Sequence, residues 1–365
     1  MIPIDYVCFM NQTGYAQAAL TNVLALDASG RYDVRVNCIH TIQKDSFSES
    51  MYRKIQSLTN KPQNPNAVQI FHLIPDMHRR VDNRLKKNIG YATFETFKPP
   101  ARWISTLNQN DAVICPSEFN AKTFEKQGVR KPIIHIPHGL DMNRWNKDVS
   151  PLYKNDDFVF LFVGTWRKRK GWDILLDAWA EAFSSNDKVR LVIKTDKVDK
   201  AKRETADRMK IFGEDLAPIL FESNIFSNDQ MPSFYKSADC LISPNLGEGF
   251  GLPPLQAMSV NVPVIVTDFS GCCDYAREDR CSLIKPDGFL HHDMMDNIPQ
   301  FAYQKWPRIK TSDVSMAMKL VVDDYDSAKD KSEKAYNFVN RNYGYDKMVE
   351  KFDYMMESVY GVNPI

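Results

Sequence analysis

The stretch Pro244-Asn-Leu-Gly-Glu-Gly-Phe-Gly-Leu-Pro-Pro-Leu-Gln-Ala-Met258 follows a short apolar run, Cys240–Ser243, and ends in residues with helical character. Its glycines Gly247, Gly249 and Gly251 permit positive φ and close approach of the backbone to a ligand. The N–H groups and the dipole of a helix N-terminus favour phosphate groups. The stretch therefore predicts a strand, a phosphate-binding loop and a helix. A glycine-rich turn without a ligand is the alternative interpretation.

Outward from this stretch, short β-branched and aromatic runs alternate with helical patterns. The predicted strands are Asp5–Met10, Val34–Ile39, Val68–Ile74, Ala112–Cys115, Ile133–Ile136, Phe158–Val163, Val189–Lys194, Cys240–Ser243 and Val262–Thr267. The predicted helices include Tyr15–Leu26, Asp173–Phe183 and Gln230–Ala238. This order predicts two doubly wound parallel α/β domains, joined by the polar linker Asp141–Asp157. A ligand is then expected between the halves, at the carboxyl ends of the strands.

Length and composition are those of an ordinary globular protein of about two domains. The chain has 365 residues, 43% of them hydrophobic and 25% charged, and a formal net charge of +1. Such a balance creates no global field that requires nucleic acid or an anionic membrane. No apolar run reaches the roughly 18 residues of a membrane-spanning helix. Seven cysteines without C-x-x-C spacing indicate free thiols in a reducing compartment, so we expect a cytoplasmic protein.

A second informative segment is Val163-Gly-Thr-Trp-Arg-Lys-Arg-Lys-Gly-Trp172, between a predicted strand and a predicted helix. Four consecutive cations there are suited to neutralising a pyrophosphate. A solvated basic loop, or an RNA-binding patch that uses Trp166 and Trp172, is the alternative.

The first stretch resembles the EGFG-x-P-x-x-E signature of the retaining glycosyltransferases of family 4. Glu248 matches the first glutamate, whereas Gln256 stands in place of the second. A glutamine keeps one acceptor and adds two donors, so it can still bind ribose without charge assistance. The basic segment resembles the same family in Arg169-Lys170-Gly171, and Ile136-Pro-His-Gly-Leu-Asp141 resembles its hinge segment.

The resemblance implies the GT-B fold, in which two Rossmann-like domains face each other across a cleft. Residues 1–145 would form the acceptor-side domain and residues 156–344 the nucleotide-sugar domain. The final helix, within residues 345–365, would cross back to the first domain.

The resemblance also implies roles for residues around the donor. Lys170 and an arginine, Arg169 or Arg167, would counter the charge on the leaving diphosphate. Glu248 would orient the sugar and Gln256 would bind the ribose. The expected donor-binding residues are completed by Gly14, Gly164, Gly249, Phe250, Gly251 and Leu252.

The first half carries weaker candidates. Gly14, in a loop that resembles the family's glycine loop, would let the backbone approach the diphosphate or the acceptor. His72 resembles the family histidine that faces the transferred sugar, although a lone strand histidine is more often a core residue, and His78 competes with it. Glu95 and Thr96 are expected at the acceptor edge, with a solvated loop as the alternative.

The resemblance therefore implies a retaining hexosyl- or pentosyltransferase that uses a nucleotide sugar. UDP is the expected nucleotide of the donor, because it is frequent in the family. No cofactor is expected, and no Asp-x-Asp site suited to Mg²⁺ occurs. The acceptor stays open among a glycan, a lipid-linked sugar and a modified DNA base. The basic run Arg79–Lys87 could face an anionic acceptor or membrane surface, or be a solvated helix face. A same-fold epimerase or phosphorylase and a degenerate nucleotide- or glycan-binding protein are the alternative functions.

Overall fold

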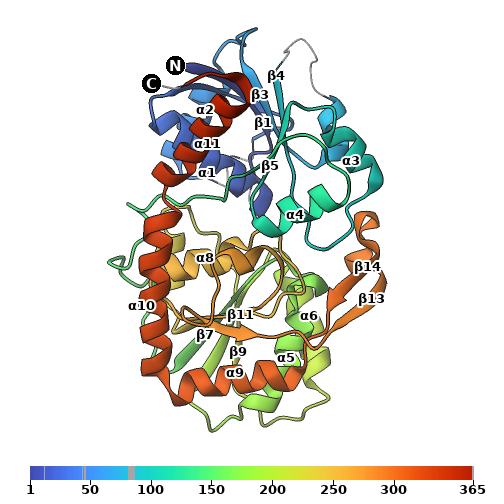
Figure 1. Ribbon diagram of the computed structural model, residues 1–365. Helices are drawn as coiled ribbons and strands as arrows, with labels where there is room; N and C mark the ends of the chain where they lie inside the picture. The colour runs from blue at the N-terminus through green and yellow to red at the C-terminus, as the bar shows by residue number, and fades with distance from the viewer. Residues whose placement is uncertain (12, 43, 45–46, 81–86, 364–365) are drawn as a thin grey trace. The chain divides into compact units, whose positions relative to one another are not determined.

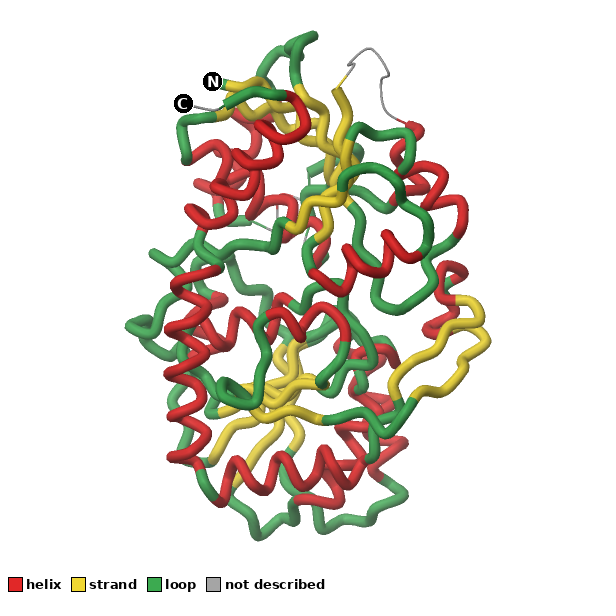
Figure 2. Tube along the Cα trace, in the orientation of Figure 1, coloured by secondary structure: helices red, strands yellow, loops and turns green. Residues whose placement is uncertain are grey.

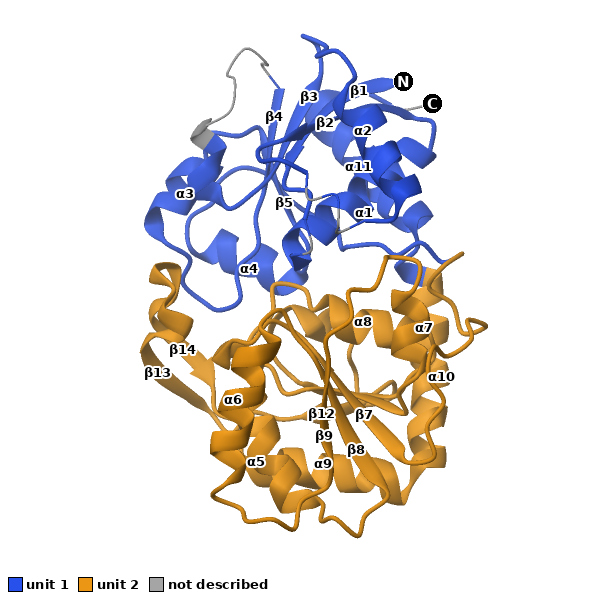
Figure 3. Ribbon diagram, turned by 180° about the vertical axis from the view of Figure 1, so that it is seen from behind, with its two compact units in different colours: residues 1–142, 342–365 blue, residues 143–341 orange. Residues whose placement is uncertain are grey.

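The structure is a computed structural model that describes residues 1–11, 13–42, 44, 47–80 and 87–363 (Figure 1). The chain forms two compact units (Figure 3): unit 1 comprises Met1–Met142 with Asn342–Ile365, and unit 2 comprises Asn143–Arg341. Each unit contains one six-stranded sheet in which all neighbouring strands are parallel. Parallel strands require crossovers, which the intervening helices supply.

The sheet of unit 1 has the order β2-β1-β3-β4-β5-β6. Its strands are β1 (Ile2–Cys8), β2 (Tyr32–Cys38), β3 (Val68–His72), β4 (Lys87–Tyr91), β5 (Ala112–Cys115) and β6 (Ile133–His135). One face is covered by α1 (Gly14–Ala28), α2 (Glu49–Thr59) and α11 (Tyr345–Tyr360), and the other by α3 (Ala101–Leu107) and α4 (Glu118–Lys126) (Figure 1). The strand order reverses between β1 and β3, which makes this pair the switch point of the sheet.

Helix α11 completes the core of unit 1. Its buried residues Met348, Phe352, Met355 and Met356 join the cluster formed by β1, β2, α1 and α2. The chain enters this helix through a parallel bridge between Leu140 and Gly344. A helix from the far end of the sequence therefore supplies apolar surface that unit 1 would otherwise lack.

Several helix starts follow directly from capping residues. Thr13 accepts a hydrogen bond from the N–H of Ala16 at the start of α1, and Ser48 caps α2 in the same way. Ser117 accepts from the N–H of Asn120 at the start of α4. Each cap satisfies one backbone donor that has no partner within the helix.

The sheet of unit 2 has the order β12-β11-β10-β7-β8-β9. Its strands are β7 (Phe158–Val163), β8 (Val189–Lys194), β9 (Ile219–Glu222), β10 (Cys240–Ser243), β11 (Val264–Thr267) and β12 (Ser282–Ile284). Its helices are α5 (Trp172–Ala182), α6 (Val198–Met209), α7 (Met231–Lys236), α8 (Leu252–Ser259), α9 (Thr311–Asp323) and α10 (Tyr325–Asn342). This is the dinucleotide-fold order, with the switch point between β7 and β10.

Figure 2 shows a separate two-stranded ribbon in unit 2, outside the main sheet. It pairs β13 (Phe289–Met294) antiparallel to β14 (Ala302–Pro307). The short turns η5 (Met295–Asn297) and η6 (Pro299–Phe301) connect the two strands.

The predicted fold class is confirmed. Four predicted strands, β5, β7, β8 and β10, have the predicted bounds, and the others differ by one to three residues at an end. The predicted strand over 68–74 ends at His72, because the chain turns into η2 (Pro75–Arg80) at a proline that cannot continue the ladder. The predicted strands do not include β4, β9, β12 or the ribbon β13–β14.

All seven cysteines are free thiols. None of the helices in the described part of the chain combines the length and the apolar character needed to span a bilayer.

Candidate functional site

The candidate site of unit 2 lies where β7 and β10 run side by side. The two strands pair in parallel, so both end at the carboxyl edge of the sheet. The loop after β7 carries the basic segment and the short turn η3 (Lys168–Lys170), and the loop after β10 carries the glycine-rich stretch. Ligands of open α/β sheets bind in the crevice at this kind of switch point.

Three charged side chains from these two loops meet there. Lys170 Nζ forms an ion pair with Glu248 Oε1, and Arg169 Nη1 lies 3.4 Å from Glu248 Oε2. Arg169 and Glu248 are only 8% and 9% exposed. Arg169 Nη1 also donates to the carbonyl oxygen of Gly247. Two cations and one carboxylate leave a net positive charge in a largely desolvated place, which attracts an anion.

The carboxyl group of Glu248 is ionised at neutral pH. Burial alone would raise its pKa, but the charges of Lys170 and Arg169 and their hydrogen bonds outweigh burial and lower the pKa of Glu248 below its usual value. Glu248 therefore acts only as a hydrogen-bond acceptor, the form suited to holding hydroxyl groups.

The two loops approach each other closely because of one glycine. Gly171 has φ = 72°, and a Cβ there would lie 2.0 Å from the carbonyl oxygen of Pro244. The N–H of Leu246 donates to the carbonyl oxygen of Arg169 at 2.8 Å. Any larger residue at position 171 would push the basic loop away from the loop that carries Glu248.

A third loop, after β11, fixes the backbone of Glu248. The N–H of Glu248 donates to Ser270 Oγ at 2.8 Å, and the N–H of Gly271 donates to the Glu248 carbonyl oxygen at 2.9 Å. A Cβ at Gly271 would lie 2.2 Å from the carbonyl oxygen of Gly249. Both backbone polar groups of the candidate glutamate are thus held, and its side chain is left to face the cations.

The ribbon turn holds the other side of the basic loop. Asp296 accepts hydrogen bonds from the N–H groups of Lys168, at 2.6 Å, and Arg169, at 3.4 Å. The Arg169 guanidinium lies 5.8 Å from the centroid of the Phe301 ring. Asp296, Phe301 and Ser270 were not predicted, because nothing in the local sequence reveals which distant turns reach η3 and Glu248.

Comparison with known proteins agrees with this geometry. Residues 157–304 match the family described as "Glycosyl transferases group 1". A lipopolysaccharide core biosynthesis mannosyltransferase of Rhizobium meliloti is 28% identical over 191 residues, which are 44% of this chain and 46% of that protein. A lipopolysaccharide 1,2-N-acetylglucosaminetransferase of Salmonella typhimurium is 24% identical over 251 residues, 64% of this chain and 58% of that protein. The chain thus matches about half the length of these enzymes.

These matches support the interpretation of this chain as a group 1 glycosyltransferase.

Among solved structures, Anabaena HepE in complex with UDP and glucose superimposes with a TM-score of 0.72 and 12% identity, covering 98% of this chain and all of HepE. At that identity the likeness shows the fold, and the chain has a two-domain GT-B architecture.

The start of α8 offers fewer hydrogen-bond donors than expected from the sequence. Gly251, with φ = 87°, caps the helix, and Leu252 follows it. Pro253 and Pro254 come next and have no N–H group. The helix start therefore presents the N–H groups of Gly251 and Leu252, and the larger part of the positive charge comes from Arg169 and Lys170.

Two other predicted donor residues have partners within unit 2. The side-chain amide oxygen of Gln256, Oε1, accepts a hydrogen bond from Tyr235 Oη at 2.9 Å. The buried ring of Phe250 packs against Tyr275, with centroids 5.5 Å apart. A ribose contact by Gln256 would use the second lone pair of Oε1 or the amide NH₂ group.

In the basic loop, Arg169 contacts Glu248, which also pairs with Lys170. Arg167 instead precedes η3 as its cap residue. Gly164 is in ordinary van der Waals contact, with its would-be Cβ 3.6 Å from Lys170. Trp166 and Trp172 are buried and stacked on each other at 4.4 Å. The RNA-patch alternative is wrong for these tryptophans, because their faces are unavailable to bases.

In unit 1, His72 is 1% exposed at the end of β3, and its Nδ1 lies 2.8 Å from Tyr6 Oη. Burial first, and then the neighbouring histidines, lower the pKa of His72 well below its usual value, so the ring is neutral. His78 lies on the turn after β3, where its Nε2 lies 3.1 Å from the carbonyl oxygen of Leu73 and its ring stacks on Phe71. The two histidine candidates therefore differ in position and in hydrogen-bond partner: His72 lies at the end of β3, and His78 lies on the turn after it.

Of the remaining unit 1 candidates, Gly14 is the first residue of α1, whereas Glu95 and Thr96 lie in the loop after β4. A Cβ at Gly14 would meet nothing within 4 Å, so no contact within the described chain requires glycine there. Thr96 is 0% exposed and Glu95 is half-buried, so the solvated-loop alternative is wrong for Thr96. Of the basic run Arg79–Lys87, residues 81–86 lie outside the described part of the chain.

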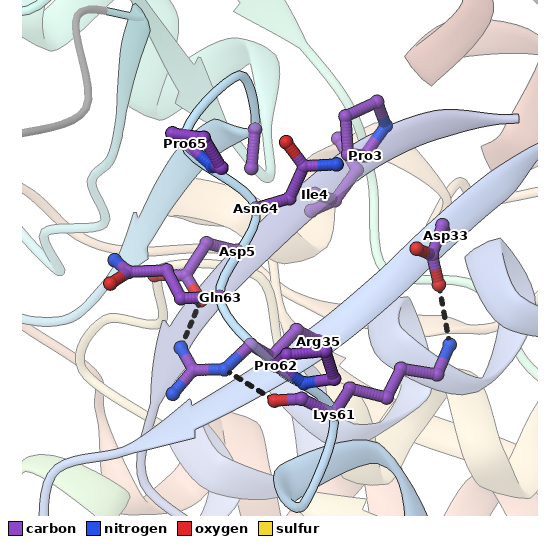
Figure 4. A pocket seen from close by; sticks show the side chains of 11 residues that line it. Pro3, Ile4, Asp5, Asp33, Arg35, Lys61, Pro62, Gln63, Asn64 and Pro65 are labelled. Atoms are coloured by element: carbon purple, nitrogen blue, oxygen red, sulfur yellow. Dashed lines mark hydrogen bonds and ion pairs between the residues drawn. The ribbon is translucent and has the colours of Figure 1, made fainter.

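A cavity of about 470 Å³ lies elsewhere in unit 1, beside the first residues of β1 and β2. Figure 4 shows its charged side chains directed at one another: Arg35 pairs with Asp5, and Lys61 Nζ lies 2.8 Å from Asp33 Oδ1. Arg35 Nε also donates to the carbonyl oxygen of Lys61 at 2.9 Å. This cavity lies at the amino edge of the sheet, opposite to the edge at which ligands of such sheets bind.

Proposed function

We propose that this protein is a retaining family 4 glycosyltransferase that moves a hexosyl or pentosyl group from a nucleotide sugar to an acceptor hydroxyl. The observation that carries the proposal is the meeting of Lys170, Arg169 and Glu248 at the β7/β10 switch point. The match of residues 157–304 to group 1 glycosyl transferases supports it.

The charges of this cluster suit the departure of a diphosphate. Negative charge grows on the phosphate oxygen as its bond to the anomeric carbon breaks, and the cations of Lys170 and Arg169 are already fixed beside it. The acceptor oxygen bonds to the anomeric carbon on the same face, and its proton passes to the departing phosphate oxygen. The protein then needs no nucleophile of its own, and the proposal includes no metal ion.

In the free protein, Glu248 holds both cations in place. When the donor binds, the diphosphate takes over part of this pairing, and the ionised Glu248 accepts hydrogen bonds from sugar hydroxyls. Charge-assisted bonds of this kind are about twice as strong as neutral ones. The same side chain therefore organises the empty site and orients the sugar.

We propose a UDP-sugar as the donor, supported by the HepE structure, which contains UDP and glucose. We propose a glycan or lipid-linked sugar as the acceptor, supported by the two bacterial relatives, whose names refer to lipopolysaccharide. The proposed cytoplasmic location is supported by the free thiols. A modified DNA base remains the less supported acceptor.

The test is binding of UDP-, GDP-, ADP- and dTDP-sugars, measured by thermal stabilisation and calorimetry on the full chain. We expect one nucleotide class to stabilise the protein, and Lys170→Ala to weaken that binding by about tenfold or more. Lys168→Ala is the matched control, because Lys168 lies in the same turn but is exposed. Equal weakening by both substitutions would indicate general electrostatic attraction and contradict the proposed site.

Retention is tested separately by NMR of the first product formed from an α-linked donor. An α-linked product supports the proposal, and a β-linked product shows inversion. Stabilisation by no nucleotide, together with absence of transfer or donor hydrolysis, would leave a degenerate binding protein as the better assignment.

A further inference from the structure

A chain of buried polar side chains leads to His72 from the interior of unit 1. Asn22 on α1 donates through Nδ2 to Tyr6 Oη on β1 at 2.9 Å, and Tyr6 Oη lies 2.8 Å from His72 Nδ1 on β3. All three residues are at most 1% exposed. These contacts join residues that are 16 and 66 positions apart in sequence.

The direction of these hydrogen bonds determines where His72 carries its proton. The amide nitrogen of Asn22 can only donate, so Tyr6 Oη accepts from it. The single proton of Tyr6 then donates to His72 Nδ1, which must be unprotonated. Because the buried ring is neutral, its proton lies on Nε2. If Nδ1 carried the proton instead, the hydroxyl proton of Tyr6 would lose its acceptor in a fully buried place.

The orientation of the Asn22 amide agrees with the cost of unsatisfied groups. Its Oδ1 is buried without a hydrogen-bond partner among the described residues. In the reversed orientation, an NH₂ group with two donors would occupy that place. Buried carbonyl oxygens are left under-satisfied more often than buried N–H groups, which favours the orientation present in the structure.

The other ring nitrogen of His72, Nε2, forms no hydrogen bond within the described part of the chain. Nε2 is buried and has no hydrogen-bond partner among the described residues. The ring is held on its faces and edge by aromatic neighbours: Tyr91 stacks at 3.7 Å between centroids, and Tyr15 meets the ring at 4.9 Å and 74°. The neutral ring therefore has one N–H group, at the β1/β3 switch point of unit 1, for which the described residues offer no acceptor.

We propose that Asn22 and Tyr6 are positioning residues that fix His72 in its Nε2–H tautomer, so that His72 donates a hydrogen bond to a ligand oxygen and does not accept the proton of an attacking hydroxyl. A neutral donor of this kind is suited to an uncharged hydroxyl or ether oxygen. Its use in sugar transfer rests on the proposed function, whereas the tautomer itself does not.

The direct test is long-range ¹H–¹⁵N NMR of the full chain labelled at histidine, with resonances assigned by His72→Gln. We expect the Nε2 of His72 to show the signature of a protonated ring nitrogen and Nδ1 that of an unprotonated one. The opposite pattern in the wild-type protein would overturn the proposal, whatever the protein binds.

Variants test whether the relay causes this state. Tyr6→Phe removes only the hydroxyl, and we expect His72 to become a mixture of tautomers. Asn22→Asp reverses the relay, because an ionised carboxylate can only accept; we then expect the Nδ1–H tautomer. Tyr15→Phe is the matched control: it removes a buried hydroxyl that has no hydrogen-bond partner among the described residues but keeps the ring that meets His72. An unchanged His72 signature in Tyr6→Phe would show that the relay does not fix the tautomer.

Kinetics separate this inference from the proposed function. If transfer is observed, Tyr6→Phe should lower kcat/KM by about tenfold, with a melting temperature close to that of Tyr15→Phe. If no transfer is observed but the tautomers respond as expected, the relay stands and the proposed function fails. If transfer is observed and Tyr6→Phe retains wild-type kcat/KM, the role of the fixed tautomer in transfer is overturned.

Discussion

The carboxyl edges of the two sheets occupy equivalent places in the two Rossmann-like units but contain different groups. In unit 2, two cations surround one ionised carboxylate, Glu248. In unit 1, neutral rings and an amide surround a neutral histidine, His72. The same backbone scaffold thus supports charge compensation in one unit and neutral hydrogen bonding in the other. The side chains that follow the strands therefore decide the chemistry of each edge, and the strand order decides only where that chemistry takes place.

We expect the greatest loss of activity from a substitution in the basic loop, where the two arginines should differ in their contribution to kcat/KM. Arg169→Ala removes a buried cation that contacts Glu248 and should lower kcat/KM by about 10²–10³-fold, the range seen when one group that stabilises a developing anion is removed. Arg167→Ala is the matched control and should lower it by less than about tenfold. Steady-state kinetics with the identified donor measure both, and equal losses would contradict the assignment of Arg169.

The second prediction is a difference in acid stability between the units. Burial lowers the pKa of His138 to about 3 and that of His78 to about 4, and burial also lowers the pKa of His72. Below pH 6.5 the unfolded chain binds protons that these buried rings do not, so unit 1 loses stability as the pH falls from 6.5 toward 3. The loss is on the order of 2 kcal/mol per histidine at pH 5.

The unit 2 cluster should respond at lower pH. The pKa of Glu248 is lowered in the folded protein, so its contribution is present above about pH 4.5 and is lost as the pH falls through the folded value. Hydrogen exchange followed by mass spectrometry, corrected for the intrinsic effect of pH, should show unit 1 peptides losing protection first. His138→Asn should reduce this loss relative to the exposed-site control His40→Asn. Simultaneous loss in both units would contradict the prediction.

The third prediction concerns the ribbon that holds the basic loop. Asp296→Ala removes the acceptor of the Lys168 and Arg169 N–H groups, so the loop should lose its fixed position and the nucleotide affinity should fall by about tenfold. Asp293→Ala, on an exposed position of the same ribbon, is the control. Calorimetry with the donor nucleotide measures the change. Tighter binding by Asp296→Ala would instead show that Asp296 competes with the ligand.

The smallest expected effect comes from Gln256→Glu, which restores the glutamate of the family signature. The carboxylate would still accept from Tyr235 and would bind ribose hydroxyls with charge assistance, so the donor KM should fall by about threefold with little change in kcat. A rise in KM would indicate that the amide NH₂ group of Gln256 is the part that binds the donor.

Much of the fold could be predicted because apolar runs bounded by turn residues, such as Phe158–Val163 and Val189–Lys194, read as buried strands without reference to the rest of the chain. The ribbon strand Phe289–Met294 escaped prediction because all six of its residues are exposed, and its charged and histidine residues resemble those of a loop. Strand patterns depend on burial, and this strand has none.

The site was predictable where residues are close in sequence. Glu248 and Lys170 could be named from local motifs, but the choice of Arg169 over Arg167 required the turn η3, which directs Arg169 toward Glu248. Asp296 accepts a hydrogen bond from Lys168, more than a hundred positions away. Asn22 acts through Tyr6 on His72, which is 50 positions away. Such contacts arise only from the folded arrangement of strands.

The return of α11 to unit 1 also sets an order of events during synthesis. Unit 2 is a continuous segment, so its entire core is available once residue 341 has emerged from the ribosome. The core of unit 1 is complete only when the helix that follows unit 2 has been made. Until then, the apolar surface that Met348, Phe352 and Met355 cover in the folded protein stays exposed. Nascent chains therefore pass through a state in which the second unit is folded and the first is not, and in that state unit 1 is the part that chaperones would bind.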